Sequence, residues 1–197
     1  MTRKTIALVW LGVVVIGVGT VRDAVAGPPT DQLRSRIDRV IGILDDGGLR
    51  ARPDERRAAL RGAAAEIFDF TEITRRSLGH HWQTVAPAER EELVRLLTAL
   101  LERSYLGRIE QYGGERIAFV GESLDGDLAT VRTRLQSKSG SEIPVDYRLY
   151  RAGGRWLTYD VSIEGVSLVG NYRAQFNKII QTSSAQGLVQ RLRARQE

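Results

Sequence analysis

The spacing of hydrophobic residues predicts helices in the first half of the chain. Between positions 30 and 112 apolar side chains recur every three or four residues, the period of a helix with one buried face. We expect Thr30 to cap a first helix and Pro53 to open a second. Asp69 is expected to cap a short third helix that stops at Gly79, and a longer helix begins at Pro87.

The helix that begins at Pro87 carries more apolar residues than a single core-facing stripe needs. Either it is buried between two layers or one of its sides lines a cavity, and burial in a core is the simpler interpretation. Its apolar positions are Leu93, Val94, Leu96, Leu97, Leu100, Leu101, Tyr105, Leu106 and Ile109.

From position 115 to 164 the hydrophobic period changes to two, which predicts strands. The turn signals Asp125-Gly126, Ser139-Gly140 and Gly153-Gly154 divide this region into four alternating runs. Tight turns join antiparallel neighbours, so we expect an antiparallel meander of about four strands covered by helices. Further helices follow at 167–195. The fold class is therefore α+β, in one domain that spans residues 27–197.

The first 26 residues have the pattern of an export signal. Arg3 and Lys4 precede an apolar run at 6–18, and Ala24-Val25-Ala26 offers small residues where a signal peptidase cleaves. We expect cleavage after Ala26 and secretion of the rest. The alternative is a retained anchor, for which the run is short, since a spanning helix needs about 20 residues.

Composition excludes several classes of protein. The chain has no cysteine, so disulfides, thiol chemistry and a lipid anchor on a cysteine are excluded. After residue 26 there are 26 basic and 23 acidic residues, because Arg3, Lys4 and Arg22 and the acid Asp23 lie before that point. A net charge of +3 is a weak argument for nucleic acid, and we expect no nucleic-acid partner.

Residues that could carry out catalysis are few. The chain has no Gly-x-Ser-x-Gly elbow, no phosphate-binding glycine loop and no His-Glu-x-x-His motif. His80 and His81 are neighbours that cannot both face one metal from a regular helix or strand, so we interpret them as loop residues and expect no metal or cofactor. Asp160, with Tyr147 and Tyr159 nearby in the sheet, leaves open an isomerase-like enzyme that abstracts a proton beside a carbonyl. The simpler interpretation is a carboxylate satisfied by a turn or an arginine.

Arginines cluster at 50–57, at 75–76 and at 191–195. Such clusters are usually solvated helix faces. The alternative is contact with anionic lipid head groups or with an acidic partner.

Several stretches together resemble a known family. The most specific lies at 156–176, where Tyr159-Asp160-Val161 precedes Glu164-Gly165-Val166-Ser167-Leu168 and Asn171-Tyr172-Arg173-x-Gln175-Phe176. Others lie at 68–82, 87–105 and 143–147, and Gly187-Leu188-Val189 completes the order. This ordered set is similar to the Mla-type periplasmic phospholipid-binding proteins, the MlaC or toluene-tolerance family. Two departures are Ala86, where relatives usually have Ser or Thr, and the aliphatic Val94 and Leu97, where they often have Phe.

The resemblance implies a periplasmic, monomeric phospholipid carrier whose sheet and helices enclose a deep apolar pocket for acyl chains. Its implied partners are the MCE-domain ring of an inner-membrane ABC transporter and an outer-membrane lipoprotein–porin complex. A hopanoid-associated branch leaves another lipid class open. Our candidates for the pocket wall are Phe70, Ile73, Leu97, Leu100, Tyr105, Val145, Tyr147, Leu149, Tyr159, Val161, Val166, Leu168, Tyr172 and Phe176. If Leu97 and Leu100 both line this pocket, tryptophan at either position should fold and reduce lipid uptake.

Overall fold

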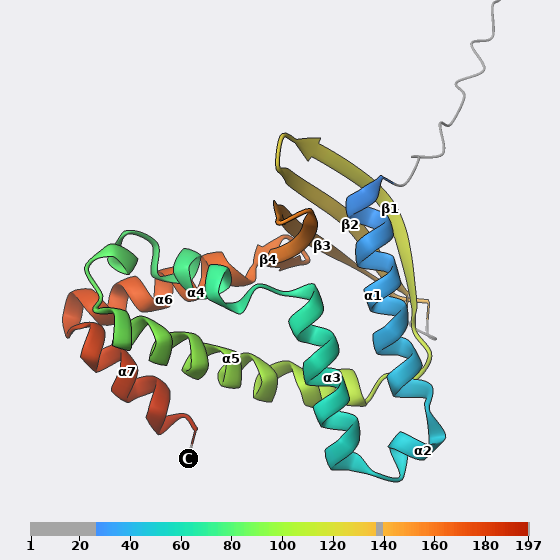
Figure 1. The fold of residues 1–197 in the computed structure, drawn as a ribbon, viewed down its shortest axis with the longest axis horizontal. Coiled ribbons are helices and arrows are strands. Elements are labelled where there is room, and N and C mark those ends of the chain that lie inside the picture. Colours follow the sequence, from blue (N-terminus) through green and yellow to red (C-terminus); the bar gives the residue numbers. More distant parts are fainter. Residues whose placement is uncertain (1–26, 137–139, 197) are drawn as a thin grey trace, which may run out of the picture.

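The structure is a computed structural model that describes residues 27–136 and 140–196 (Figure 1). The predicted export signal at 1–26 and part of the predicted turn at Ser139-Gly140 lie outside the described residues. Among the described residues, no helix is both long enough and apolar enough to cross a membrane.

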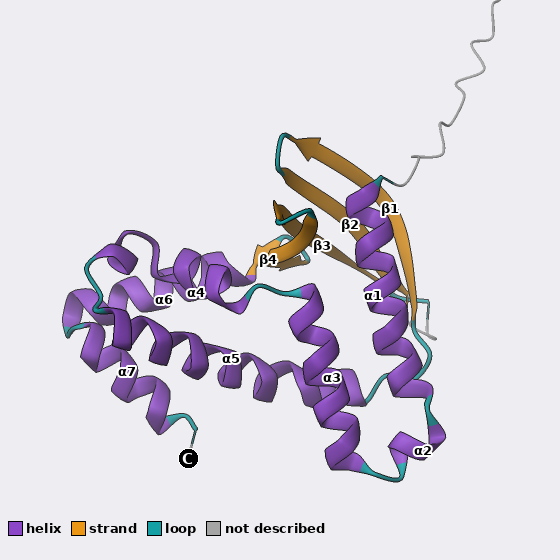
Figure 2. Ribbon diagram, in the orientation of Figure 1, coloured by secondary structure: helices purple, strands orange, loops and turns teal. Residues whose placement is uncertain are grey.

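Helices and strands follow in the predicted order (Figure 2), which confirms the α+β fold class. The N-terminal helices are α1 (Pro28–Asp45), α2 (Gly47–Arg50), α3 (Pro53–Ile67), α4 (Phe70–Leu78), the short 3-10 helix η1 (Gly79–Gln83) and α5 (Pro87–Glu110). The strands are β1 (Arg116–Asp125), β2 (Leu128–Gln136), β3 (Glu142–Ala152), β4 (Arg155–Ile163) and β5 (Val166–Ser167). The chain closes with α6 (Leu168–Thr182) and α7 (Ala185–Ala194).

The sheet is an antiparallel meander in the order β1-β2-β3-β4-β5. It has one strand more than expected, because β5 folds back on the end of β4 and pairs Val166 with Ile163. The turn between them holds Glu164 and Gly165 at φ values of 51° and 81°. Positive φ at both central residues is what a tight hairpin turn of matching twist requires.

The start of the first helix differs from the prediction. Helix α1 begins at Pro28, after Gly27, and not at Thr30. Thr30 lies inside the first turn, where its backbone N–H and its hydroxyl both donate to the Glu122 carboxylate of β1. The predicted cap at Asp69 is confirmed, because its side chain accepts from the Glu72 N–H at α4. The structure adds a cap at α6, where Ser167 accepts from the Gly170 N–H. Ala86 makes no side-chain cap at α5.

The buried apolar residues form two clusters and not one. The sheet core lies where α1 and α3 pack on one face of the sheet, as Figure 1 shows for α1. It contains Leu33, Ile37, Ile67, Ala129, Val131, Leu149 and Trp156. The helical core lies among α4, α5, α6 and α7, beside β4. It contains Ile73, Leu78, Val85, Leu93, Leu96, Leu97, Leu101, Val169, Tyr172, Phe176, Leu188, Val189 and Leu192. The helices of this second core pack mainly on one another, and α4 and α6 also contact β4.

Candidate functional site

Five of the predicted wall residues are fully packed in the two cores. Leu149 belongs to the sheet core, and the other four, Ile73, Leu97, Tyr172 and Phe176, belong to the helical core. A ligand reaches such side chains only if their neighbours move, because the interior is closely packed.

Seven other predicted residues keep part of their surface accessible. Phe70, Leu100, Tyr105 and Leu168 lie at the margin of the helical core. Val145, Tyr147 and Val161 come from the neighbouring strands β3 and β4. The predicted wall residues are thus divided between the margin of the helical core and the strands that carry the sheet core.

Strand register places the second group on one face of the sheet. Tyr147 is directly opposite Val161 on β4 and opposite Val131 on β2. Val145 is opposite Thr133 and Ile163. Because directly opposed residues in an antiparallel pair share a face, these side chains point to the side of the sheet that α1 and α3 cover. We call this the inner face.

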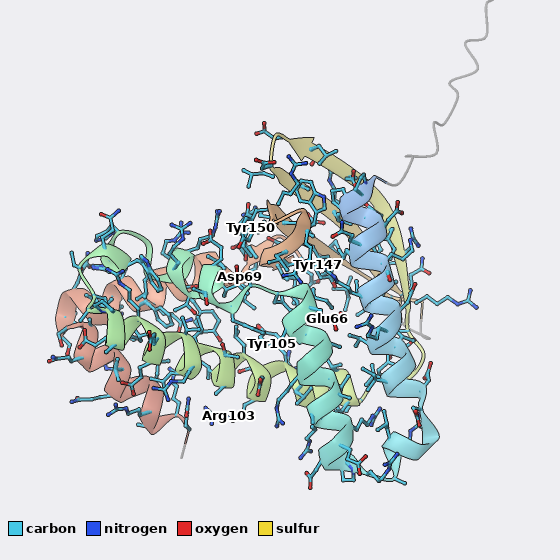
Figure 3. The ribbon with its side chains drawn as sticks, viewed as in Figure 1. Glu66, Asp69, Arg103, Tyr105, Tyr147 and Tyr150 are labelled. Atoms are coloured by element: carbon cyan, nitrogen blue, oxygen red, sulfur yellow. The ribbon has the colours of Figure 1, made fainter. Side chains whose placement is uncertain are left out.

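Tyr147 is both deep in the protein and partly accessible. Burial raises the pKa of its hydroxyl to about 12, yet the side chain keeps accessible surface. Figure 3 shows Tyr147 and Tyr105 on either side of the segment that joins α3 to α4.

Phe68, which is not among the predicted wall residues, packs against both cores. It forms a parallel bridge with Thr158 at the edge of β4, and its ring lies 6.0 Å from that of Phe70. The sequence does not reveal this contact with both cores, because Phe68 lies between two helical segments and only long-range pairing brings it beside β4. We use the name apolar seam for a set of partly buried residues at the margins of the two cores: Phe68, Phe70, Leu100, Tyr105, Tyr147, Val161 and Leu168.

Two leucines of the long helix α5, which were both predicted to line the pocket, differ in burial. Leu97 is 0% exposed in the helical core, whereas Leu100 is partly buried at its margin. Free space beside both side chains was expected; the Leu97 side chain has no accessible surface in this structure, and its contact with lipid stays a prediction. The interpretation of α5 as a core helix holds for Leu93, Leu96, Leu97 and Leu101, which are all buried.

Tyr159 and Val166 do not join the seam. Tyr159 is the extra residue of a β-bulge opposite Arg148, so its ring lies on the outer face, against Tyr150 and 3.7 Å from the Arg76 guanidinium. Bulges redirect side chains in this way, and an alternating pattern does not reveal them. Val166 is 64% exposed on β5, where it pairs with Ile163, itself 38% exposed.

Asp160 is satisfied where it stands, as the simpler interpretation predicted. Its carboxylate is 3% exposed and accepts three hydrogen bonds. The donors are the Val169 N–H at 3.0 Å, the Ser167 hydroxyl at 2.6 Å and the Arg148 guanidinium at 3.2 Å. Asp160 is opposite Arg148 on the outer face, so it points away from Tyr147. This network fixes the start of α6 to β4.

Asp69 holds α4 to the sheet in a similar way. Its backbone N–H donates to the Thr158 carbonyl at 3.0 Å, and its carboxylate accepts from the Glu72 N–H and from the Tyr150 hydroxyl. Burial and this hydrogen bond to Asp69 raise the pKa of Tyr150 to about 12. The outer face of β3 and β4 therefore carries a polar network that anchors both α4 and α6.

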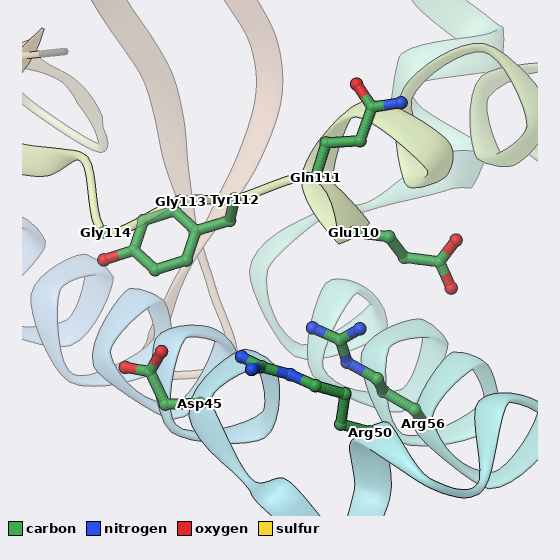
Figure 4. A pocket seen from close by; sticks show the side chains of 8 residues that line it. All are labelled: Asp45, Arg50, Arg56, Glu110, Gln111, Tyr112, Gly113 and Gly114. Carbon is green, nitrogen blue, oxygen red and sulfur yellow. The ribbon is translucent and has the colours of Figure 1, made fainter. Parts of the chain in front are cut away.

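The described residues also form two surface cavities, and neither contains a predicted wall residue. One of about 440 Å³ (Figure 4) is polar and lies between the α1–α3 corner and the end of α5. It is lined by Asp45, Arg50, Arg56, Glu110, Gln111, Tyr112, Gly113 and Gly114. The other, of about 570 Å³, lies between η1 and α6. An enclosed apolar pocket remains a prediction, and the seam is the place where the structure could form one.

Comparison with known proteins identifies the same family that the motifs indicated. A model of the MlaC protein family matches residues 34–194. A phospholipid-binding protein from Ralstonia solanacearum, solved in complex with a phospholipid, has a similar structure, with a TM-score of 0.77 at 24% sequence identity. The match covers 86% of this chain and 97% of that one. At this identity the likeness establishes a shared fold, and the bound phospholipid is a property of that protein.

Proposed function

This chain belongs to the MlaC family, and from that membership and the apolar seam we propose that it is a phospholipid carrier. The observation that carries the proposal is the division of the apolar interior into two cores that meet at Phe68. Apolar side chains at the margins of both cores remain partly accessible, and acyl chains are a ligand that such surfaces favour.

The energetics of transfer suit a carrier without catalysis. Each methylene group removed from water contributes about 0.8 kcal/mol, so two acyl chains strongly prefer any apolar environment to water. A bilayer and an apolar protein surface offer nearly the same environment. Movement of a lipid between them is then close to balanced, and the protein needs only a dry surface and a way to open it.

The two tyrosines of the seam suit the boundary between acyl chains and head group. Tyr105 and Tyr147 each present an apolar ring and one hydroxyl. A tyrosine hydroxyl is neutral at physiological pH, and burial raises the pKa of Tyr147 further, to about 12, so it adds no charge to the apolar surface. We propose that the acyl chains lie along the seam and that the head group stays outside.

The location and partners follow from the same proposal. Cleavage after Ala26 would release the protein into the periplasm as a monomer, where a lipid carrier connects the two membranes. The proposed exchange partners are the MCE-domain ring of an inner-membrane ABC transporter and an outer-membrane lipoprotein–porin complex. The geometry of Asp160 gives no support to the isomerase-like alternative, because its carboxylate is saturated and lies on the face opposite Tyr147.

The decisive experiment is to identify the lipid that the protein carries. Residues 27–197 are produced by export, purified without detergent and studied by native mass spectrometry, and the bound molecules are then extracted and identified. We expect a phospholipid bound one to one, and uptake of labelled phospholipid from liposomes by protein stripped of lipid.

A matched pair of variants locates the site. Val161→Asp places a carboxylate on the inner face beside Tyr147, whereas Glu164→Asp changes only the exposed turn that follows β4. We expect the first to abolish uptake and the second to leave it unchanged. Apo protein alone in the native spectra, with no uptake from liposomes, would refute the carrier. Recovery of a hopanoid in place of phospholipid would refute the ligand class and retain the carrier.

A further inference from the structure

The groove between η1 and α6 assembles residues that lipid binding does not use. It has a volume of about 570 Å³, and its lining comes from two separate segments of the chain. Its residues are Leu78, Gly79, His80, His81, Gly170, Arg173, Ala174 and Asn177. The sequence predicted a loop for the His80-His81 pair, but both residues lie in the 3-10 helix η1, beside the arginine of α6.

The polar side chains of this groove are held in place by the protein. The Arg173 Nε donates to the Arg76 carbonyl at 2.8 Å, which leaves its two terminal nitrogens for another partner. The His81 ring is hydrogen-bonded to the Asn177 side-chain oxygen at 2.9 Å. The His80 ring lies against that of His81 in a tilted arrangement, with 3.8 Å between the ring centroids. Side chains fixed in advance lose less entropy when a ligand binds.

Negative charge is scarce around the groove. None of its lining residues is acidic, and residues 167–196 contain five arginines or lysines and no acid. The carboxylate of Glu72, on α4, is already engaged by Arg75 and Arg76 at 2.5 and 2.6 Å. Within the described ranges Arg173 forms no ion pair. Most arginines of α3 and α4, in contrast, are paired with a glutamate.

We propose that this groove is a docking site for an acidic segment of a partner protein. Arg173 would receive a carboxylate at one wall and His80 a second group at the other, while Leu78 and Ala174 supply an apolar floor. The concave shape favours a peptide over a bilayer surface, because a flat array of head groups does not enter a groove, whereas an extended segment does. Glycine at 79 and 170 keeps both walls free of larger side chains.

The test measures binding of a fluorescein-labelled peptide of alternating Glu and Ala residues to the lipid-loaded protein at low salt. Arg173→Glu should weaken the affinity by about tenfold, since an attraction becomes a repulsion at a partly exposed site. His80→Glu should weaken it in the same direction. Lys178→Glu is the matched control, because Lys178 is exposed on the same helix and outside the groove. It makes the same charge change and should leave the affinity nearly unchanged.

Three outcomes would overturn the proposal. One is an equal loss of affinity in Arg173→Glu and Lys178→Glu, which would indicate only general attraction to a basic surface. Another is failure of the wild-type protein to bind the peptide. The third is binding to phosphatidylglycerol vesicles that Arg173→Glu abolishes while peptide binding persists, which would indicate a membrane contact. Thermal unfolding of each variant confirms that it is folded, and unchanged phospholipid content shows that lipid binding is intact.

Discussion

The two faces of strands β3 and β4 differ in how their side chains are satisfied. On the inner face Val145, Tyr147 and Val161 are apolar or neutral and keep accessible surface. On the outer face the polar side chains of Tyr150 and Asp160 are each bonded to a partner from another element or strand. The same two strands therefore present an accessible apolar surface on the inner face and a hydrogen-bonded polar network on the outer face.

This difference separates stability from ligand binding. Hydrogen bonds of the outer face are directional, so they fix α4 and α6 to the sheet in one arrangement. Apolar contacts on the inner face are non-directional, and so they can be exchanged for contacts with a flexible acyl chain. Substitutions on the outer face should mainly change the free energy of unfolding, and those on the inner face should mainly change lipid binding.

The largest loss of stability is expected from Asp160→Asn. The amide keeps the shape of the side chain but removes the charge and turns one acceptor into a donor, which leaves a buried donor such as the Val169 N–H unpaired. We expect the free energy of unfolding, measured by chemical denaturation, to fall by about 3 kcal/mol.

The control for this change is Asp146→Asn, on the same face of β3 opposite Ser162. Asp146 has no ion pair within the described residues, so its substitution should change stability by no more than about 0.5 kcal/mol. Phospholipid bound per folded molecule should be the same in both variants. Equal destabilisation by the two would show that the Asp160 network has no special role.

A smaller effect on stability distinguishes core from seam on α5. Leu97→Trp forces a larger ring into a fully packed site and should cost about 1–3 kcal/mol. Leu100→Trp extends into accessible space at the margin of the helical core and should cost less. It should also reduce phospholipid uptake, because the ring would occupy part of the seam. Thermal melts and liposome uptake assays on both variants test this, and the reverse ranking in stability would place Leu100 in the core.

The smallest effect should appear only at alkaline pH. Tyr147 has a pKa of about 12 in the folded protein against about 10 for an unfolded tyrosine. Its contribution to stability is therefore full below pH 10 and is lost as the pH rises toward 12, because the unfolded state releases the proton first. Tyr147→Phe should flatten this part of the pH profile of unfolding and leave the free energy at pH 7 nearly unchanged.

Tyr150→Phe provides the comparison from the outer face. It also removes a hydroxyl with a raised pKa, but that hydroxyl donates to Asp69. Its loss should cost about 1–2 kcal/mol at neutral pH as well. If both phenylalanine variants behaved alike at pH 7, the two faces would not differ in the way described.

Local patterns in the sequence predicted most of the fold. The cap at Asp69, the proline that opens α3 and the glycine turns of the hairpins each act over a few residues, so the chain alone specifies them. Strand alternation also placed Val145, Tyr147 and Leu149 correctly on one face. Thr30 was misjudged as a cap because its partner, Glu122, is distant in sequence.

The sequence by itself determined the order of helices and strands, the family and the apolar character of the candidate site. Only the tertiary structure decided that the interior divides into two cores, that Phe68 joins them, that Tyr159 faces outward and that Leu97 is packed while Leu100 is accessible. The physical reason is that hydrophobicity records a preference to leave water. It does not record which apolar neighbour fills the space, because that depends on contacts between residues far apart in the chain.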